Sequence, residues 1–573
     1  MVRSRGSDEP GEPTGGGMIL DLLQRRLLPA LALLVAVGPL IFRGFPQGHD
    51  WSFELVRIAE YRAALAGGQL PPYWAENLYG GYGSPIFLFY APAFLLVSAL
   101  LSWIVSMPTA AVISLVGLAC LAFWAAGRML VAAGGGDVGA DRGAARVAGY
   151  VYVLSPYLLG DALIRNANAE YAGLAAAPLA LAALFRLRRP DRRTVVALAL
   201  GLAAVILAHN LTALVVAGLL VLGAAGLYLP SPPRGCSVAL AKGVALGLGL
   251  AAFFWIPALA LGSWMRPEEL LEGKFDFHVQ FPRLVQLFGY ERFFSLGALP
   301  PLIWLGGAFA LLREWRRSPR VARILFGALL ACAGFLLLSL RVSTPIWETL
   351  PFLPLFQFPW RMGGPLALMT ALIAGLCFAR LGVRLPSRAR AAFELAVLAL
   401  CIANAAPRIL GYRPLPPPVR AQLGDALRPE RIRAGTQSAT VRDEYLPRTA
   451  SRQVWRRERP SLGPLVSPLP EIHAVVEENR GTRIVLVVEA ARATRIRLAR
   501  WDFPGWRAEI DGQPARVLRS PTGAIELEVP EGRSRVSLRL TPPAVRRLAS
   551  GLSLASAVLL ALLIVVRPVH SRT

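Results

Sequence analysis

Cysteine is scarce in this sequence. Only 5 of its 573 residues are cysteines, and they lie in or beside apolar runs, without metal-type spacing: Cys120, Cys236, Cys332, Cys377 and Cys401. This distribution excludes a disulfide framework and gives no indication of a redox role. Walker A, GxGxxG, HExxH, GxSxG and CxxC motifs are absent wherever they would carry meaning, which argues against a nucleotide-driven pump and a standard protease.

Acidic residues are also few, with 36 Asp and Glu against 61 Lys and Arg, so that the formal net charge is +25. In a soluble protein this surplus would indicate nucleic-acid binding. Here much of the arginine stands in short clusters between apolar runs, which is the pattern that marks cytoplasmic loops. The charge therefore predicts topology, and we expect no nucleic-acid partner.

Long apolar runs, by contrast, are abundant. Hydrophobic residues make up 55% of the chain, and the mean hydropathy is +0.49. Many runs approach the ~20 residues that cross a bilayer. Thirteen such runs lie at 27–42, 85–105, 110–131, 147–163, 172–185, 195–207, 211–229, 244–261, 299–312, 324–340, 363–378, 392–409 and 548–566. The sequence therefore predicts a polytopic α-helical protein of the plasma membrane with about 12–13 spans.

Arginine clusters give the expected orientation. Those at 186–193, 313–323, 380–390 and 567–573 predict cytoplasmic segments, and Arg25-Arg26 before the first run predict an uncleaved signal anchor. Both termini, including a disordered tail at 1–26, are then cytoplasmic. An odd number of crossings cannot join two ends on one side, so we expect the run 85–105, which begins in a Pro/Gly/aromatic turn, to lie in the outer leaflet without crossing.

The same topology places the region 411–547 outside the membrane, after a transmembrane domain at 27–410. It begins Pro-rich at 414–418 and then carries alternating β-branched runs at 482–488, 494–498, 524–529 and 535–540. Turn signals at Asp511-Gly512 and Glu531-Gly532 separate such runs. We therefore expect an extracytoplasmic β-sandwich before the final span at 548–566.

His49-Asp50 open the first external loop, 44–84, just beyond the first span. A carboxylate placed here is a candidate for function, and beside an imidazole it could act as a general base or a metal ligand. Asp50 also precedes an amphipathic segment at 51–65 that carries Arg57, so it could instead be a helix N-cap. The residues alone leave both alternatives open.

Three further polar groups fall on the same predicted side. The island at 165–171 combines Arg165, Asn168 and Glu170, and could share a metal with Asp50 and bind phosphate, or could be an ordinary loop with an Arg–Glu ion pair. His209 could contact substrate or be an interfacial residue. The FQFPWR segment at 356–361 could hold a lipid phosphate or belong to an aromatic belt. Aromatic residues at 501–506 could stack on a sugar or pack in a core.

These motifs also form a series that resembles a known family. They are HD at 49–50, YGGYGSP at 79–85 with FYAP at 89–92, SPY at 155–157, Arg165 with Glu170, AHN at 208–210 and QFPWR at 357–361. In this order, over roughly the whole membrane region, they resemble the bacterial 6-pyruvoyl-tetrahydropterin synthase-related membrane protein family. Nothing in the chain resembles a pterin synthase itself.

The architecture resembles the GT-C superfamily of integral membrane glycosyltransferases, which take a sugar from a polyprenyl-phosphate carrier at the outer membrane face. The tail from Trp501 is similar to their terminal β-domain. The resemblance implies Asp50 as the acid of the first external loop and Glu170 as the second acid. A single Asp stands where a DxD or paired acids would be expected, so a divalent metal (Mg²⁺ or Mn²⁺) held by Asp50 and Glu170 remains an open alternative.

The function that the resemblance implies is transfer of a sugar from a polyprenyl-phosphate donor to an extracytoplasmic acceptor, with Asp50 and Glu170 as catalytic residues. The residues expected to bind substrate are His49, Arg57, Tyr82, Arg165, Asn168, His209, Trp360 and Arg361. The alternative is a non-enzymatic lipid or glycan translocator, or a scaffold in cell-surface polymer assembly.

Overall fold

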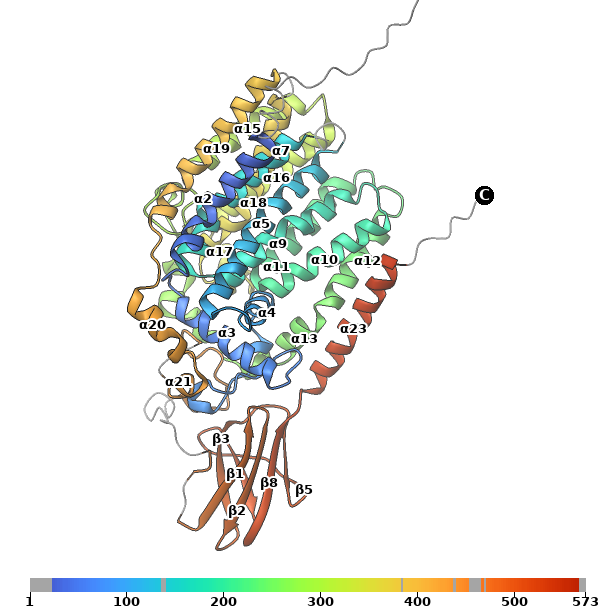
Figure 1. The fold of residues 1–573 in the computed structure, drawn as a ribbon. Coiled ribbons are helices and arrows are strands. Elements are labelled where there is room, and N and C mark those ends of the chain that lie inside the picture. Colours follow the sequence, from blue (N-terminus) through green and yellow to red (C-terminus); the bar gives the residue numbers. More distant parts are fainter. Residues whose placement is uncertain are drawn as a thin grey trace, which may run out of the picture.

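The computed structural model describes residues 23–135, 141–382, 385–435, 439–452, 465–467 and 470–565. The predicted tail at 1–26 falls outside these residues except at 23–26, and the predicted tail at 567–573 lies wholly outside them. The described chain forms a helical bundle that carries a β-domain at one end (Figure 1).

Eight helices of the described chain are long and apolar enough to cross a membrane, and the count reaches ten when two bent pairs are each taken as one span. In a helix the backbone N–H and C=O groups hydrogen-bond to each other within the segment, which the apolar core of a bilayer requires. The single helices are α2 (Leu28–Arg43, preceded by the π-turn Leu23–Leu27), α5 (Met107–Gly134), α9 (Asn168–Arg186), α11 (Asn210–Tyr228), α16 (Pro319–Ser339), α18 (Gly363–Gly382), α19 (Ser387–Leu410) and α23 (Ala544–Val565). The chain is a multi-pass membrane protein.

Each of the two bent pairs breaks within one predicted run. The first joins α7 (Arg142–Val153) to α8 (Pro156–Gly160) and the π-turn η4 (Asp161–Arg165), with a bend of 41°. The second joins α12 (Cys236–Leu250) to α13 (Ala252–Ala260), with a bend of 72°. The first break follows from Pro156, because a proline disfavours helical backbone dihedrals in the residue that precedes it.

The count of eight to ten is lower than the expected 12–13, and the difference lies in three shorter helices. These are α4 (Pro92–Leu101), α10 (Arg192–Ala208) and α15 (Leu299–Glu314), with 10, 17 and 16 residues. At 1.5 Å per residue α4 is only about 15 Å long, half the thickness of a hydrocarbon core. This length agrees with the prediction that the run 85–105 does not cross.

Helix α9 lies at the centre of the bundle. Together with α18 it is 94% buried over its most apolar window, whereas α11 and α23 are 22% and 17% buried. Alanine and glycine permit this central position: a Cβ on Gly201 of α10 would come within 2.9 Å of the backbone nitrogen of Ala180, so the two helices pack closely. The first turn of α9 carries Glu170, which is therefore held in the most enclosed part of the bundle.

A layer of short helices and loops covers the end of the bundle next to the β-domain (Figure 1). In Figure 1 this layer includes α3 (Trp51–Ala66), α20 (Pro417–Ala426) and α21 (Pro429–Arg433). The other short helices outside the spans are η2 (Tyr79–Gly81), η3 (Ile86–Leu88), η5 (Gly262–Trp264), η6 (Pro267–Leu271), η7 (Gly273–Phe275), η8 (Phe277–Val279), α14 (Leu284–Phe288), η9 (Arg341–Ser343), α17 (Thr344–Thr349), η10 (Pro354–Phe356) and η11 (Pro359–Met362).

The β-domain consists of two antiparallel sheets, as expected for a sandwich. One sheet has the order β1-β2-β8-β4-β5 and the other β3-β7-β6. The strands are β1 (Ile472–Arg480), β2 (Arg483–Ala490), β3 (Thr494–Trp501), β4 (Trp506–Ile510), β5 (Gln513–Ala515), β6 (Leu518–Arg519), β7 (Ala524–Val529) and β8 (Gly532–Leu540). Alternate residues such as Ile525, Leu527 and Val529 are buried, which is the period-2 pattern of a sheet with one face in a core.

The described part of 411–452 differs from the predicted β-rich domain, because it is helical and irregular and packs on the first external loop. The Gln47 nitrogen donates to the Arg413 oxygen at 2.8 Å, and Ser84 Oγ donates to the Tyr445 oxygen at 3.0 Å. Proline at 414 and 416–418 explains the lack of a sheet there, since proline cannot donate to a strand ladder. The β-domain proper begins at β1.

Candidate functional site

Asp50 stands at the N-cap of α3, as the structural alternative expected, but its side chain does not act as a cap. Within the described residues its carboxylate accepts no hydrogen bond and forms no ion pair. Only its backbone is bound: the His49 nitrogen donates to the Ile164 oxygen at 3.0 Å, and the Asp50 nitrogen donates to the Arg165 oxygen at 2.9 Å. These backbone bonds hold Asp50 in place, and its half-buried carboxylate acts on His49 and Arg165 through its charge without a hydrogen bond or ion pair to either residue.

Gly48 allows this close approach between the first loop and the island at 165–171. A Cβ at position 48 would lie 2.0 Å from Asn166 Oδ1 and 2.6 Å from the Ile164 oxygen. Asn166 itself adopts a left-handed conformation (φ 57°), which asparagine tolerates better than most residues. The two segments named in the sequence as candidate sites are therefore in direct contact.

Glu170 lies at the centre of a buried charge network. Its Oε1 accepts a hydrogen bond from Tyr157 Oη at 2.6 Å. Its Oε2 accepts from Arg165 Nη1 at 3.2 Å and lies 3.3 Å from Arg361 Nε. Arg165 also pairs with Asp161 one helical turn earlier. Two arginines and two carboxylates thus balance each other out of contact with water, as buried charges must.

Trp360 and Arg361 complete one wall of this network. The guanidinium of Arg165 lies 4.7 Å from the centre of the Trp360 ring, which itself stacks on Phe358 at 4.8 Å. Arg361 donates to the Phe356 oxygen at 2.8 Å and to Gln357 Oε1 at 3.1 Å. Trp360 is buried, so in this arrangement it supports Arg165 and has no open face for a substrate.

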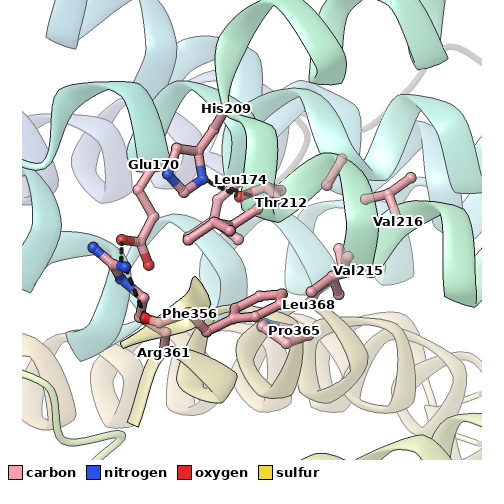
Figure 2. A pocket seen from close by; sticks show the side chains of 12 residues that line it. Glu170, Leu174, His209, Thr212, Val215, Val216, Phe356, Arg361, Pro365 and Leu368 are labelled. Carbon is pink, nitrogen blue, oxygen red and sulfur yellow. Dashed lines mark hydrogen bonds and ion pairs between the residues drawn. The ribbon is translucent and has the colours of Figure 1, made fainter. Parts of the chain in front are cut away.

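His209 meets Glu170 and Arg361 around a small cavity of about 20 Å³ (Figure 2). Its Nδ1 lies 2.9 Å from Thr212 Oγ1 and caps α11. Burial is the main influence on this ring and lowers the pKa of His209 to about 4, although Glu170 acts in the opposite direction. His209 is therefore neutral near pH 7, and the cavity has room for about one water molecule.

Glu54 was not among the expected site residues, yet it lies one turn after Asp50 on α3. It is buried and accepts hydrogen bonds from Arg57 at 2.7 Å, from Tyr90 at 2.6 Å and from Asn168 at 3.3 Å. Burial raises the pKa of Glu54, against the opposing influence of Arg57. The i, i+4 spacing of Asp50 and Glu54 was the available signal.

The expected substrate ligands Arg57 and Asn168 are thus committed to Glu54. Arg57 further donates to the Ala439 oxygen at 2.9 Å and lies over the Tyr90 ring at 4.3 Å. These contacts tie the segment after position 439 to the first loop. Both residues are positioning groups in this structure and not open binding groups.

Lys274 is a second residue that sequence patterns did not single out. It is exposed, and it belongs to the loop of short helices between α13 and α14. The pKa of His49 is lowered, mainly by partial burial, which outweighs the opposite influence of Asp50. The positive charges of Arg165 and Lys274 lower it further, so Lys274 is close enough to act on this imidazole. No sequence motif marks this lysine, since the loop folds back over the site only in three dimensions.

Tyr82 contacts the β-domain. Its ring lies 4.3 Å from that of Trp501, and its backbone oxygen accepts a hydrogen bond from the Trp501 nitrogen at 3.1 Å. Trp501 is buried, as the packing alternative for the aromatic segment at 501–506 expected. We therefore assign Tyr82 to the junction between the first loop and the β-domain.

The predicted metal site does not fit the side chains present. Both oxygens of Glu170 are already engaged, and the two guanidinium groups beside it would repel a divalent cation. In the described part of the chain, no three His, Cys, Asp or Glu side chains are grouped so that they could hold a metal ion. A metal shared by Asp50 and Glu170 is therefore not supported, and no step below is derived through one.

An apolar groove lies farther along the helices that line the cavity at Glu170. The cavity is lined by Leu174 of α9, Val215 of α11 and Leu368 of α18 (Figure 2). A groove of about 910 Å³ is lined by the following turns of the same helices, at Leu181, Leu219 and Leu372, and by one face of α16. Asp50 does not line the cavity; it reaches Glu170 through Arg165.

No protein-family model and no curated protein sequence matches the chain, so the pterin synthase-related resemblance is not confirmed. Several solved structures are similar to it. Three of them are the mycobacterial arabinofuranosyltransferase AftD (19% identity, 67% of this chain, 26% of that chain, TM-score 0.44), the oligosaccharyltransferase AglB of Archaeoglobus fulgidus with an inhibitory peptide and a dolichol-phosphate (13%, 68%, 56%, 0.44), and ArnT of Cupriavidus metallidurans bound to undecaprenyl phosphate (17%, 68%, 64%, 0.41). The chain covers less than two thirds of the length of each.

Proposed function

We propose that this protein transfers a sugar from a polyprenyl-phosphate donor to a hydroxyl group of an acceptor, at the end of the bundle that carries the β-domain. The observation that carries the proposal is the Asp50 carboxylate: it has no partner among the described residues, and its backbone is fixed against the Arg165–Glu170–Arg361 network. Asp50 is half-buried, and a carboxylate at the end of a membrane span is a candidate for function.

In this proposal Asp50 accepts the proton of the acceptor hydroxyl as the oxygen attacks the anomeric carbon. The bond between that carbon and the phosphate oxygen breaks, and the electron pair leaves with the polyprenyl phosphate. Attack from the face opposite the leaving group gives inversion. Arg361, whose side chain is 15% exposed, is the cation of the network best placed to offset the charge that develops on the phosphate.

Glu170 then acts as a positioning residue. Both of its oxygens are used to hold Tyr157, Arg165 and Arg361, so it has none to offer to a substrate. Arg165, which also pairs with Asp161, has the same role. This assignment revises the catalytic role that the sequence resemblance implied for Glu170 and keeps that role for Asp50.

The apolar groove supports a lipid-linked donor. Its lining is continued by successive turns of α9, α11 and α18 from the cavity below Arg361, and its other wall is α16. An isoprenoid chain in this groove would place its phosphate at the polar end. In the proposed orientation both termini are cytoplasmic, the site faces the extracytoplasmic side, and the β-domain helps to hold the acceptor glycan.

One observation favours the non-enzymatic alternative. A fully compensated network around Glu170 is also what a lipid or glycan translocator or a scaffold would need for stability alone. The two functions differ in Asp50, because only an enzyme requires the charge of a residue that contributes no contact to the fold.

The test is complementation of a deletion strain with the wild type or with Asp50→Asn, followed by mass spectrometry of lipid-linked sugars and surface glycans. We expect Asp50→Asn to reach the membrane at wild-type levels, while a lipid-linked donor accumulates and one sugar is missing from a surface polymer. General-base catalysis contributes about 10²–10⁴-fold to rate, so the loss should be clear. Full rescue by Asp50→Asn would exclude the catalytic role and leave the translocator or scaffold.

A further inference from the structure

A second cleft lies at the end of the bundle away from the β-domain. It has a volume of about 780 Å³ and is lined by the last three turns of α5, the last turns of α9 and α10 (Arg192–Ala208) as far as Ala204. Arg186 ends α9, whereas Glu170 lies in its first turn. These 16 residues of helix separate the two sites by about 24 Å at 1.5 Å per residue. The cleft is therefore distinct from the proposed catalytic site.

Positive charge dominates the mouth of this cleft. Four arginines line it, from three segments of the chain: Arg128, Arg186, Arg188 and Arg189. The one acid among the lining residues is Asp191, whose Oδ1 accepts hydrogen bonds at 2.7 Å from both the nitrogen and Oγ1 of Thr194 and so caps α10. Within the described residues none of the four guanidinium groups forms an ion pair.

The remaining lining is apolar and open to the surroundings of the bundle. Trp124 on α5 is 55% exposed and Leu200 on α10 is 48% exposed. Between them lie small side chains, including Ala182 and Ala204, which leave room at the surface of α9. Arginine binds phosphate oxygens with its planar set of donors, and an acyl chain suits an apolar channel. One ligand that matches both halves is an anionic phospholipid.

We propose that this cleft binds an anionic phospholipid from the membrane leaflet at that end of the bundle, with its phosphate among the four arginines and an acyl chain along α5 and α10. Arginines that only keep a loop on the cytoplasmic side of the membrane do not need to line a cleft. Arg316 and Arg317, in the loop between α15 and α16, are such residues, since both are exposed and neither lines the cleft. The proposal does not depend on the function proposed above.

The test uses the purified full-length protein in detergent, titrated with phosphatidylglycerol or phosphatidylcholine and followed by native mass spectrometry. The variant is Arg128→Gln with Arg188→Gln, and the matched control is Arg316→Gln with Arg317→Gln, which removes the same charge outside the cleft. Each basic residue near a lipid surface contributes a factor of about five in affinity, so the cleft variant should bind phosphatidylglycerol about 30-fold more weakly. The control should bind like the wild type.

A second variant, Ala204→Phe, fills the apolar half and keeps every charge. We expect it to weaken phosphatidylglycerol binding while the protein remains folded by circular dichroism, so the test does not depend on the arginine variant alone. Equal weakening in the control would overturn the proposal, as would equal binding of phosphatidylcholine. Displacement of the lipid by an equal concentration of glycerol 3-phosphate would show a site for free phosphate and would also overturn it.

Discussion

Replacement of Glu170 by glutamine should lower both stability and activity, whereas replacement of Asp50 by asparagine should lower activity alone. The wild-type network holds two carboxylates, Asp161 and Glu170, against two guanidinium groups, Arg165 and Arg361. Glu170→Gln leaves one guanidinium uncompensated among side chains that are 6%, 7% and 15% exposed. Removing one partner of a buried pair costs about 3–5 kcal/mol, and we expect the lower end because glutamine keeps one acceptor oxygen.

Asp50→Asn should instead change stability by less than about 0.5 kcal/mol, because the side chain has no described partner to lose. The control for the network is Glu170→Gln with Arg361→Gln, in which the charges balance again. Since the two residues are in contact, the double variant should recover about 1–3 kcal/mol relative to the sum of the single variants. Unfolding in detergent, followed by circular dichroism, gives the stabilities, and lipid-linked sugar analysis gives the activities.

Two results would refute this reasoning. If Asp50→Asn were as unstable as Glu170→Gln, the Asp50 carboxylate would have a structural partner and its loss of activity would mean nothing for catalysis. If Glu170→Gln were as stable as the wild type, the charge balance around Arg165 and Arg361 would not be what fixes those cations. The first outcome would withdraw the catalytic role proposed for Asp50, and the second would withdraw the positioning role assigned to Glu170.

Three further predictions concern other parts of the chain. Burial raises the pKa of Glu60 to about 7 from 4.5, so the folded state holds a proton that the unfolded chain releases. The contribution of Glu60 to stability should therefore be fully present below pH 4.5 and fall by about 3 kcal/mol as the pH rises to 7, and Glu60→Gln should remove this slope in melting curves taken from pH 5 to 8. Gly327→Trp should narrow the groove without strain, since a Cβ there meets nothing within 4 Å, and raise the donor KM, whereas Gly218→Trp, equally open but outside the groove, should not. Gly48→Ala should lower kcat and expression because its Cβ would strike Asn166; a fully active variant would show that Asp50 is not held as described.

The fold could be predicted from the sequence wherever a local pattern decides it. Apolar runs of about 20 residues predict spanning helices, and alternating β-branched runs predict strands. Both are predictable because their backbone hydrogen bonds form within the helix or within one sheet. The breaks in α7–α8 and α12–α13 were missed, since hydropathy is continuous through both. The helices α20 and α21 were missed too, because prolines at 416–418 read as irregular although proline is favoured in a first helical turn.

The sequence could predict in part which candidate residues lie together, and the reason is physical. Polar residues at span ends stand out against apolar surroundings, and this signal found Asp50, Glu170, His209 and Arg361. This signal could not predict which charged side chains form ion pairs with each other. Arg165 pairs with both Asp161 and Glu170 only because the π-turn η4 brings the three side chains together.

Partner choice also decides the roles within the site. Arg57 looked like a free cation on an amphipathic helix, and folding commits it to Glu54 and the Ala439 oxygen. Asp50 looked no different from a cap, and folding leaves it without a partner among the described residues. A buried charge without compensation is costly, so the fold pairs the buried Arg57, Arg165 and Glu170, whereas Asp50 is half-buried and can stay unpaired as a candidate for catalysis. That difference exists only in the folded chain, which is why the sequence resemblance implied a catalytic role for Glu170 as well as for Asp50.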